Sequence, residues 1–383
     1  MPRTEPSMKR ENLLMVADSE HDANMLYAVR MFVPDPFIYL RLNGKCHIVM
    51  NDLEFDRARK QAPHCRVLSW SQYAKKLKQQ GVKSQGFAAV IRRILQEKRI
   101  KKVFVPASFQ HGLARDLRRL KIKVKVKEGQ FFPEREFKTA DEVKKISAAL
   151  MMAEVGLAEG IQALKNTRIG KKRRLMYHNV PLTSEKLRGI IDIAIIQAGG
   201  VASHTIVAGG RQACDPHEQG HGALRAHEPI IIDIFPRSQK TGYFGDITRT
   251  VVKGRASEAV RRLYHTVARA QEIGFENMES GVPGAEVHKT VKEFFDGAGY
   301  KTGRHDGRMQ GFFHGTGHGL GLEIHETPRL SSTSNDYLRE GHVVTVEPGL
   351  YYPEWGGVRL EDVAYIAGNS PRNLTKFEKV LEL

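Results

Sequence analysis

Three histidines, His314, His318 and His325, lie in a glycine-rich stretch at residues 311–327. Glycine carries no Cβ, so backbone and side chains can approach one point closely. Neutral imidazole is the commonest metal ligand among side chains and a frequent general acid or base. Because a glycine-rich stretch with histidines is also compatible with an ordinary turn, the interpretation depends on other residues.

Four acidic residues stand inside apolar runs of the sequence. An unpaired buried carboxylate costs several kcal/mol, so buried acids are normally paired or bound to metal. These acids are Asp233, Asp246, Glu347 and Glu361. Together with one histidine, they predict a metal site. Carboxylates with one imidazole and no thiolate favour Mn²⁺, with Co²⁺ or Zn²⁺ as alternatives.

The length and composition fit a globular protein with two domains. The chain has 383 residues, of which 41% are hydrophobic and 27% are charged. No run reaches the roughly 18 apolar residues of a membrane span, and the start lacks the apolar core of a signal peptide. We therefore expect a cytoplasmic protein without membrane contact. Cys46, Cys65 and Cys214 are widely spaced and odd in number, so we expect three reduced, inert thiols.

The formal net charge of +17 raises nucleic acid as a partner, because clustered lysines and arginines are typical of phosphate binding. Residues 121–127 alternate basic with apolar side chains, which is also typical of a strand with one solvated face. No aromatic stacking platform accompanies the charge. The sequence therefore favours the solvated face and disfavours nucleic acid.

The first part of the chain predicts a small α/β domain. A strand pair is expected over residues 37–50, turning at Asn43-Gly44, a strong hairpin signal. Helices are expected over residues 87–97 and 113–120, and strands over residues 102–106 and 121–127. Alternating strands and helices indicate an α/β domain over residues 1–136. No cluster in it suggests chemistry.

The second part, residues 137–383, predicts an α+β domain. Thr139 with an acid three positions later marks the start of a long helix to about residue 163. Further helices are expected at residues 183–198, 256–278 and 284–298. Strands are expected at residues 203–208, 229–235, 242–253, 342–352 and 357–366. All four acids and the clustered histidines fall in this domain.

From about residue 137 to its end, the chain resembles the pita-bread metallopeptidases, the family of methionine aminopeptidase, Xaa-Pro aminopeptidase, prolidase and creatinase. The matching blocks occur in the same order, among them Gly-His318-Gly-Leu-Gly, Val-Glu347-Pro-Gly and Arg-Leu-Glu361-Asp. The resemblance implies two divalent ions. Asp246 and Glu361 would bridge them, Asp233 would hold one, and His318 with Glu347 would hold the other.

The resemblance also assigns roles beyond the metal. Glu347 would relay a proton from the water that bridges the two ions, and His325 would steady the substrate and the tetrahedral intermediate. His217 would contact the substrate or leaving group. His314 and Arg359 are typical of proline-specific members, and either substrate contact or orientation of the ligands would explain them.

Two features depart from the family. The loop between Asp233 and Asp246 is two residues longer than usual, which preserves the facing of the strands because side chains alternate with period two. Thr333 stands where dipeptide-selective prolidases carry an arginine that binds the substrate carboxylate. Arg329 is the nearest arginine, and Thr333 therefore predicts that longer peptides are cleaved at least as well as dipeptides.

The resemblance implies an Xaa-Pro aminopeptidase or Xaa-Pro dipeptidase that uses a metal-bridging hydroxide to cleave the bond before proline. Creatinase lacks the metal ligands, and methionine aminopeptidases generally lack a preceding domain of this size. Proline-containing peptides would be the substrates, and a homodimer is implied. The alternative is a non-catalytic protein of this fold that binds nucleic acid or protein through its basic surface; the complete ligand set weighs against it.

Overall fold

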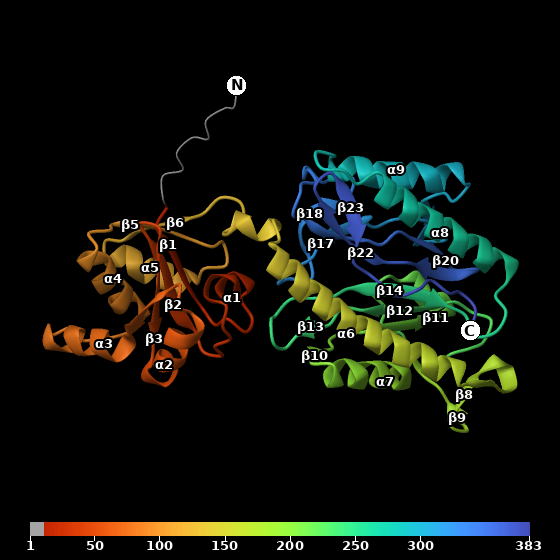
Figure 1. Cartoon of the computed structure of the whole chain (residues 1–383), viewed down its shortest axis with the longest axis horizontal. Coiled ribbons are helices and arrows are strands. Elements are labelled where there is room, and N and C mark those ends of the chain that lie inside the picture. Colours follow the sequence, from red (N-terminus) through yellow and green to blue (C-terminus); the bar gives the residue numbers. More distant parts are fainter. Residues whose placement is uncertain (1–10) are drawn as a thin grey trace. The chain divides into compact units, whose positions relative to one another are not determined.

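The computed structural model describes residues 11–383, and the chain divides between Glu134 and Arg135 into two compact units (Figure 1). The division lies two residues before the boundary expected from the sequence. Within the described range, no helix combines the length and apolar character needed to cross a membrane. The cytoplasmic location expected from the sequence stays a prediction.

The first unit is an α/β domain built on one six-stranded sheet in the order β4-β3-β2-β1-β5-β6. Its elements are β1 (Leu13–Ala17), α1 (Ala23–Val29), β2 (Phe37–Leu42), β3 (Lys45–Met50), α2 (Asp52–Gln61), β4 (Arg66–Ser69), α3 (Trp70–Gln79), α4 (Phe87–Glu97), β5 (Lys102–Val105), α5 (His111–Arg119) and β6 (Lys123–Val126).

The helices pack against hydrophobic residues on both faces of this sheet. Side chains of α3, α4 and α5 form one core cluster on one face, and those of α1 and α2 form another on the opposite face. The hairpin predicted at Asn43-Gly44 is confirmed: both residues have positive φ, and Leu42 pairs with Lys45. The predicted α4 is confirmed with the same bounds, and β5 ends one residue before the end of the predicted strand.

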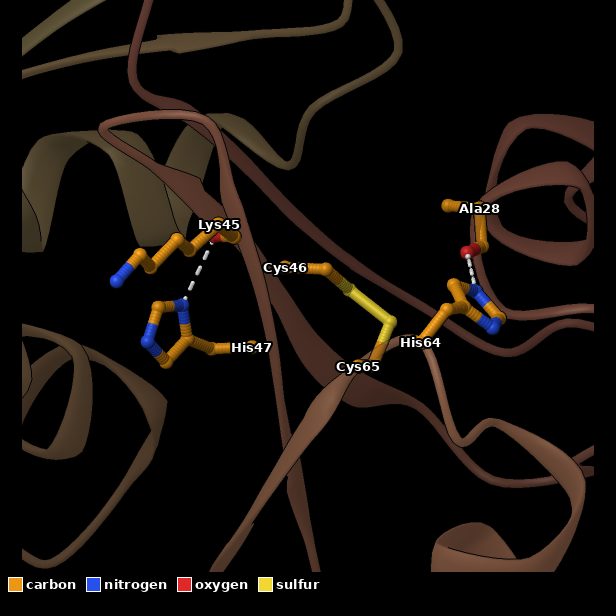
Figure 2. The surroundings of a disulfide bond; sticks show 6 residues. All are labelled: Ala28, Lys45, Cys46, His47, His64 and Cys65. Atoms are coloured by element: carbon orange, nitrogen blue, oxygen red, sulfur yellow. Dashed lines mark hydrogen bonds between the residues drawn. A yellow bond between two sulfur atoms is a disulfide. The ribbon is translucent and has the colours of Figure 1, made fainter.

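The expectation of three reduced thiols is wrong for two of them. Cys46 and Cys65 form a disulfide, with their Cα atoms 4.7 Å apart (Figure 2). Cys46 lies on β3 and Cys65 immediately precedes β4, and the two strands pair in parallel with His47 opposite Arg66. The return of α2 brings the cysteines together, and their separation in sequence does not reveal it. Cys214 is a free, buried thiol, and burial raises its pKa to about 12.

The second unit is α+β. Its helices are α6 (Ala140–Lys165), α7 (Ser184–Gln197), α8 (Glu258–Glu276) and α9 (Gly284–Gly297). Its strands are β7 (Arg168–Ile169), β8 (Leu175–Tyr177), β9 (Val180–Pro181), β10 (Gly200–Val201), β11 (Ile206–Gly209), β12 (Ile230–Ile234), β13 (Arg237–Ser238), β14 (Ile247–Val251), β15 (Gly303–His305), β16 (Arg308–Gln310), β17 (Gly317–Gly319), β18 (Glu326–Leu330), β19 (Val343–Val346), β20 (Gly349–Tyr352), β21 (Gly356–Arg359), β22 (Asp362–Ala367) and β23 (Ser370–Asn373).

Two antiparallel sheets form the centre of this unit, in the orders β11-β12-β14 and β18-β17-β19-β22-β23. Helices α6 and α7 lie on one side of the sheets, and α8 and α9 lie on the other (Figure 1). The four predicted helices are all present, and α6 begins with the expected capping box between Thr139 and Glu142. An isolated bridge between Thr248 and Glu361 connects the two sheets.

Candidate metal centre

The five residues predicted as metal ligands all line one cavity of about 890 Å³ in the second unit. Asp233 lies on β12, and Asp246 immediately precedes its neighbour β14. His318 is in the middle of β17, and Glu347 directly follows the adjacent β19. Glu361 lies between β21 and β22, where the Thr248 bridge joins it to β14.

Two glycines allow the elements that carry ligands to approach this closely. Gly245 precedes Asp246 and lies against α6, where a Cβ would be 2.4 Å from the carbonyl carbon of Ala149. Gly317 precedes His318, and a Cβ there would be 1.9 Å from the Thr345 carbonyl oxygen on β19. A side chain at either position would push a ligand away from the cavity.

The hydrogen bonds of His318 determine which ring nitrogen faces the acids. Its Nδ1 is 3.1 Å from the Gly319 carbonyl oxygen, which can only accept, so Nδ1 carries the proton. The Nε2 lone pair therefore faces oxygens of Asp246 at 3.7 Å and Glu347 at 3.4 Å. A lone pair that faces carboxylates needs a metal ion or a proton between them. Burial lowers the pKa of His318 to about 3, so a metal ion fits better than a proton on the ring.

The carboxylates fit the same conclusion. Ligand atoms of Asp246, His318 and Glu361 all lie within 4.8 Å of one another. Asp233 has one oxygen bonded by Arg359, while its buried Oδ1 has no hydrogen-bond partner. Thr248 donates to Glu361 at 2.7 Å and leaves the other carboxylate oxygen available. Because these oxygens are hard ligands with one imidazole, the set suits divalent ions such as Mn²⁺.

Crowding of the acids changes their protonation. Burial and the neighbouring Glu361 raise the pKa of Asp246, and burial and Glu347 raise the pKa of Glu361. Burial raises the pKa of Glu347 to about 7, and Asp233 adds to the effect. Without a cation the cluster therefore retains protons near neutral pH, and metal binding must release them.

We expect metal ions to stabilise the protein more at about pH 8 than at about pH 5.5. A carboxyl group whose pKa is raised by folding favours the folded state while it is protonated. For Glu347 this contribution is lost as pH rises from 4.5, its ordinary value, through about 7. Divalent ions replace the lost protons over the same window. The measurement is the difference in Tm between samples with Mn²⁺ and with chelator, and equal differences at both pH values would contradict it.

Arg359 and His314 are joined through a residue that the sequence did not single out. Arg359 donates to Asp233 at 2.7 Å and to the Tyr351 hydroxyl at 3.0 Å. Tyr351 lies 2.8 Å from His314 Nε2 and is fully buried. Because His314 Nδ1 faces the Gly315 carbonyl at 2.8 Å, Nδ1 is the donor and Nε2 accepts from Tyr351. Nothing in the local sequence distinguishes Tyr351 from Tyr352.

The remaining predicted site residues also line the cavity. His325 lies next to His318, with ring centroids 4.4 Å apart and planes nearly perpendicular. His217 lines the cavity from the loop before β12. Arg329 lines it too, since it stands opposite His318 in the β17–β18 pair and therefore shares its face. Thr333, by contrast, is exposed and is not among the lining residues.

Comparisons with known proteins agree with this geometry. Residues 144–367 match the model of metallopeptidase family M24. A Xaa-Pro dipeptidase of Pyrococcus furiosus is 33% identical over 245 residues, which cover 64% of each chain. That of Pyrococcus horikoshii is 31% identical over 288 residues, covering 74% of this chain and 75% of the relative.

Two solved structures share the fold across almost the whole chain. An X-Pro aminopeptidase from Thermotoga maritima has a TM-score of 0.81 at 22% identity, covering 97% of both chains. A prolidase from Pyrococcus furiosus has a TM-score of 0.77 at 23% identity, covering 96% of this chain and 97% of its own. The α/β domain followed by a pita-bread domain is thereby confirmed. The chain is a metallopeptidase that belongs to family M24, in the group of Xaa-Pro peptidases.

Proposed function

We propose that this protein hydrolyses the peptide bond before proline with two divalent ions held by Asp233, Asp246, His318, Glu347 and Glu361. The convergence of these five side chains in one cavity carries the proposal. His314 and Arg359, the residues typical of proline-specific relatives, lie beside the same cavity, which supports proline over other residues. The names of the relatives, Xaa-Pro dipeptidases, agree with this substrate class.

When bound, such ions supply a deprotonated water near neutral pH and polarise the scissile carbonyl. The chain's own residues supply proton transfer and orientation. We assign the uptake of the water proton to Glu347, because its carboxylate lines the cavity 3.4 Å from the Nε2 atom of His318. His325 lies beside the ligands and has no acidic partner among the described residues. We propose that it stabilises the negative charge that develops on the substrate.

We assign Arg359 and His314 to positioning rather than substrate contact. The Arg359 guanidinium is buried, and three of its five N–H donors are engaged by Asp233, Tyr351 and Thr248. His314 uses both ring nitrogens within the protein. His217 is exposed in the cavity lining, and it fits contact with the substrate or the leaving group.

Mn²⁺ is the ion that we propose, since the site offers oxygen ligands and a single imidazole. The homodimer implied by the family resemblance stays a prediction. It is supported by exposed apolar side chains on the two adjacent helices α6 and α7, namely Met151, Val155, Ile193 and Ile196. The non-catalytic alternative has no observation in its favour at this site, because the ligand set is complete.

We propose that dipeptides are preferred, contrary to what Thr333 suggests. A dipeptide places its proline carboxylate inside the site, and arginine holds a carboxylate with two charge-assisted hydrogen bonds. Arg329 can do this from β18, since its side chain faces the cavity beside His318. Thr333 cannot supply such a bond from its exposed position.

The proposal is tested by kcat/KM for Ala-Pro, Ala-Pro-Ala and Ala-Ala with Mn²⁺ at fixed pH. We expect Ala-Pro to be cleaved best and Ala-Ala poorly. In Arg329→Ala, kcat/KM for Ala-Pro should fall about 10- to 100-fold. This is the loss expected when a hydrogen bond between charged groups, which contributes about 1.5–3 kcal/mol, is removed. Ala-Pro-Ala should change little.

Arg339→Ala is the matched control, because Arg339 lies in the segment after β18 and outside the cavity lining. Cleavage of Ala-Ala as fast as Ala-Pro would refute proline specificity. A tripeptide preference in the unaltered protein would refute the dipeptide preference and the role of Arg329, but not proline specificity.

A further inference from the structure

The positive charge of the chain is concentrated in the first unit. Residues 1–134 contain 27 lysines and arginines against 13 acidic residues, whereas residues 135–383 contain 33 against 30. Within residues 57–127 the imbalance is larger, with 21 basic residues against two acidic ones. The peptidase site lies in the second unit and does not explain this charge.

The strand directions bring much of this charge to one edge of the six-stranded sheet. All strands except β2 run in the same direction, so the amino-terminal ends of β3, β4, β5 and β6 share an edge. Nine exposed cations lie at these strand starts and in the connections that enter them. This basic edge consists of Lys45, Arg66, Lys98, Arg99, Lys101, Lys102, Arg118, Lys121 and Lys123.

Several contacts show that the basic edge is continuous. Lys102 and Lys123 are paired across β5 and β6, and the Lys123 N–H donates to the Lys101 carbonyl oxygen at 2.8 Å. On strand β4, Arg66 directly follows Cys65 of the disulfide and is paired with His47, two residues after Lys45. Burial lowers the pKa of His47, and the charges of Lys98 and Arg66 lower it further, so the end of α4 reaches this region. In Figure 2, the side chains of Lys45 and His47 extend from β3 on the side opposite the disulfide.

Ion pairs among the described residues do not account for these cations. Within residues 11–383, none of the nine forms an ion pair, and the nearby acids Glu97 and Asp116 are paired with other basic residues. Helices α4 and α5 have their C-termini at this edge, and the dipole of each helix places about half a negative charge at its C-terminus. One cation at each helix C-terminus would be enough to offset this partial charge, whereas the basic edge contains nine.

Two of these cations also occupy unfavourable backbone positions. Arg99 follows α4 with φ of 56°, and Lys121 follows α5 with φ of 64°. Glycine is the usual residue at this left-handed position after a helix, because the left-handed conformation costs other residues about 1–2 kcal/mol of conformational free energy. The chain therefore keeps a charge at both places where glycine would stabilise the fold.

We propose that the basic edge binds the phosphate backbone of duplex nucleic acid without reading its sequence. Neighbouring strands are about 4.8 Å apart, so the edge presents a row of cations, and a duplex offers about one negative charge per 1.7 Å of its axis. The aromatic ring at the edge, Phe104, is covered by Lys102 Nζ at 4.2 Å, which disfavours base stacking. Among residues 11–134 the exposed large hydrophobic side chains are Leu53 and Val126, neither of them at this edge, which disfavours insertion into a membrane.

The left-handed positions provide a test that preserves the fold. In the full-length protein, Arg99→Gly with Lys121→Gly removes two charges from the basic edge and relieves backbone strain. The matched control is Arg30→Gly with Lys172→Gly, which removes two exposed cations with φ of 58° and 55° that lie elsewhere. Binding of a labelled random-sequence DNA duplex is measured by fluorescence anisotropy over a series of salt concentrations.

We expect the unaltered protein to bind the duplex with an affinity that falls steeply as salt rises. The edge variant should bind roughly tenfold more weakly, and its plot of log K against log salt should be shallower by about two, one for each lost phosphate contact. The control variant should match the unaltered protein, and all three should cleave Ala-Pro equally. Equal affinities in the two variants, no salt dependence, or tighter binding to phosphatidylserine vesicles than to the duplex would overturn the proposal.

Discussion

Replacing Asp246 by Asn is expected to remove both the bound metal and the turnover. The substitution keeps the size of the side chain but removes one of the charges that face the Nε2 lone pair of His318. We expect kcat to fall by at least about 10²- to 10³-fold, the scale of losing one preorganised electrostatic contact at a reacting centre. Glu361→Gln should behave alike, because Glu361 joins the same cluster. Metal content is measured by mass spectrometry of the dialysed protein.

The same variant should make the metal-free protein more stable. Burial and neighbouring acids raise the pKa of Asp246, so its charged form opposes folding when no cation is present. An uncharged Asn removes this repulsion, and Tm in the presence of chelator should rise. Asp192→Asn is the control, since Asp192 is hydrogen-bonded to Thr205 outside the cavity. Full activity of Asp246→Asn after exhaustive chelation would refute the metal site.

The local elements could be predicted because their signals are local. Asn43-Gly44 permits the positive φ values that a tight hairpin requires, and Thr139 with Glu142 satisfies the first backbone N–H groups of α6. The metal ligands could be predicted for a similar reason. A carboxylate inside an apolar run must be buried, and a buried carboxylate needs a partner.

The expected strands over residues 342–352 and 357–366 are each divided in the structure, and each division coincides with a ligand. Pro348 follows Glu347, and proline has no N–H to continue the ladder between β19 and β20. Glu361 separates β21 from β22, because the chain there leaves one sheet to bridge Thr248 in another. Periodicity predicts strands but not the point where a strand changes its partner.

Features that depend on long-range pairing could not be predicted. The disulfide follows from the parallel pairing of β3 and β4, and the inward position of Arg329 follows from its place opposite His318. Tyr351 belongs to the site only because its hydroxyl lies between Arg359, on the paired strand β21, and His314, 37 residues earlier in the chain. Strand register determines all of these contacts, and the sequence shows no local signal for it.

Replacing His325 by Ala is expected to lower kcat without removing the metal. The side chain lines the cavity next to His318 but is not part of the group of ligand atoms around it. Burial lowers the pKa of His325, with Arg329 adding to the effect, so the ring is neutral at pH 7 and can donate one hydrogen bond to a developing oxyanion. A positioned acid or base of this kind contributes about 10²- to 10⁴-fold, and we expect a loss in that range.

His318→Ala is the matched comparison, because the two rings touch and only one of them faces the acids. Metal content should fall in His318→Ala and stay unchanged in His325→Ala. If His325 acts on the transition state, kcat and kcat/KM for Ala-Pro should fall by the same factor, since an interaction made only there leaves KM unchanged. Loss of metal from His325→Ala to the same extent as from His318→Ala would show that His325 acts by supporting the ligand through ring packing.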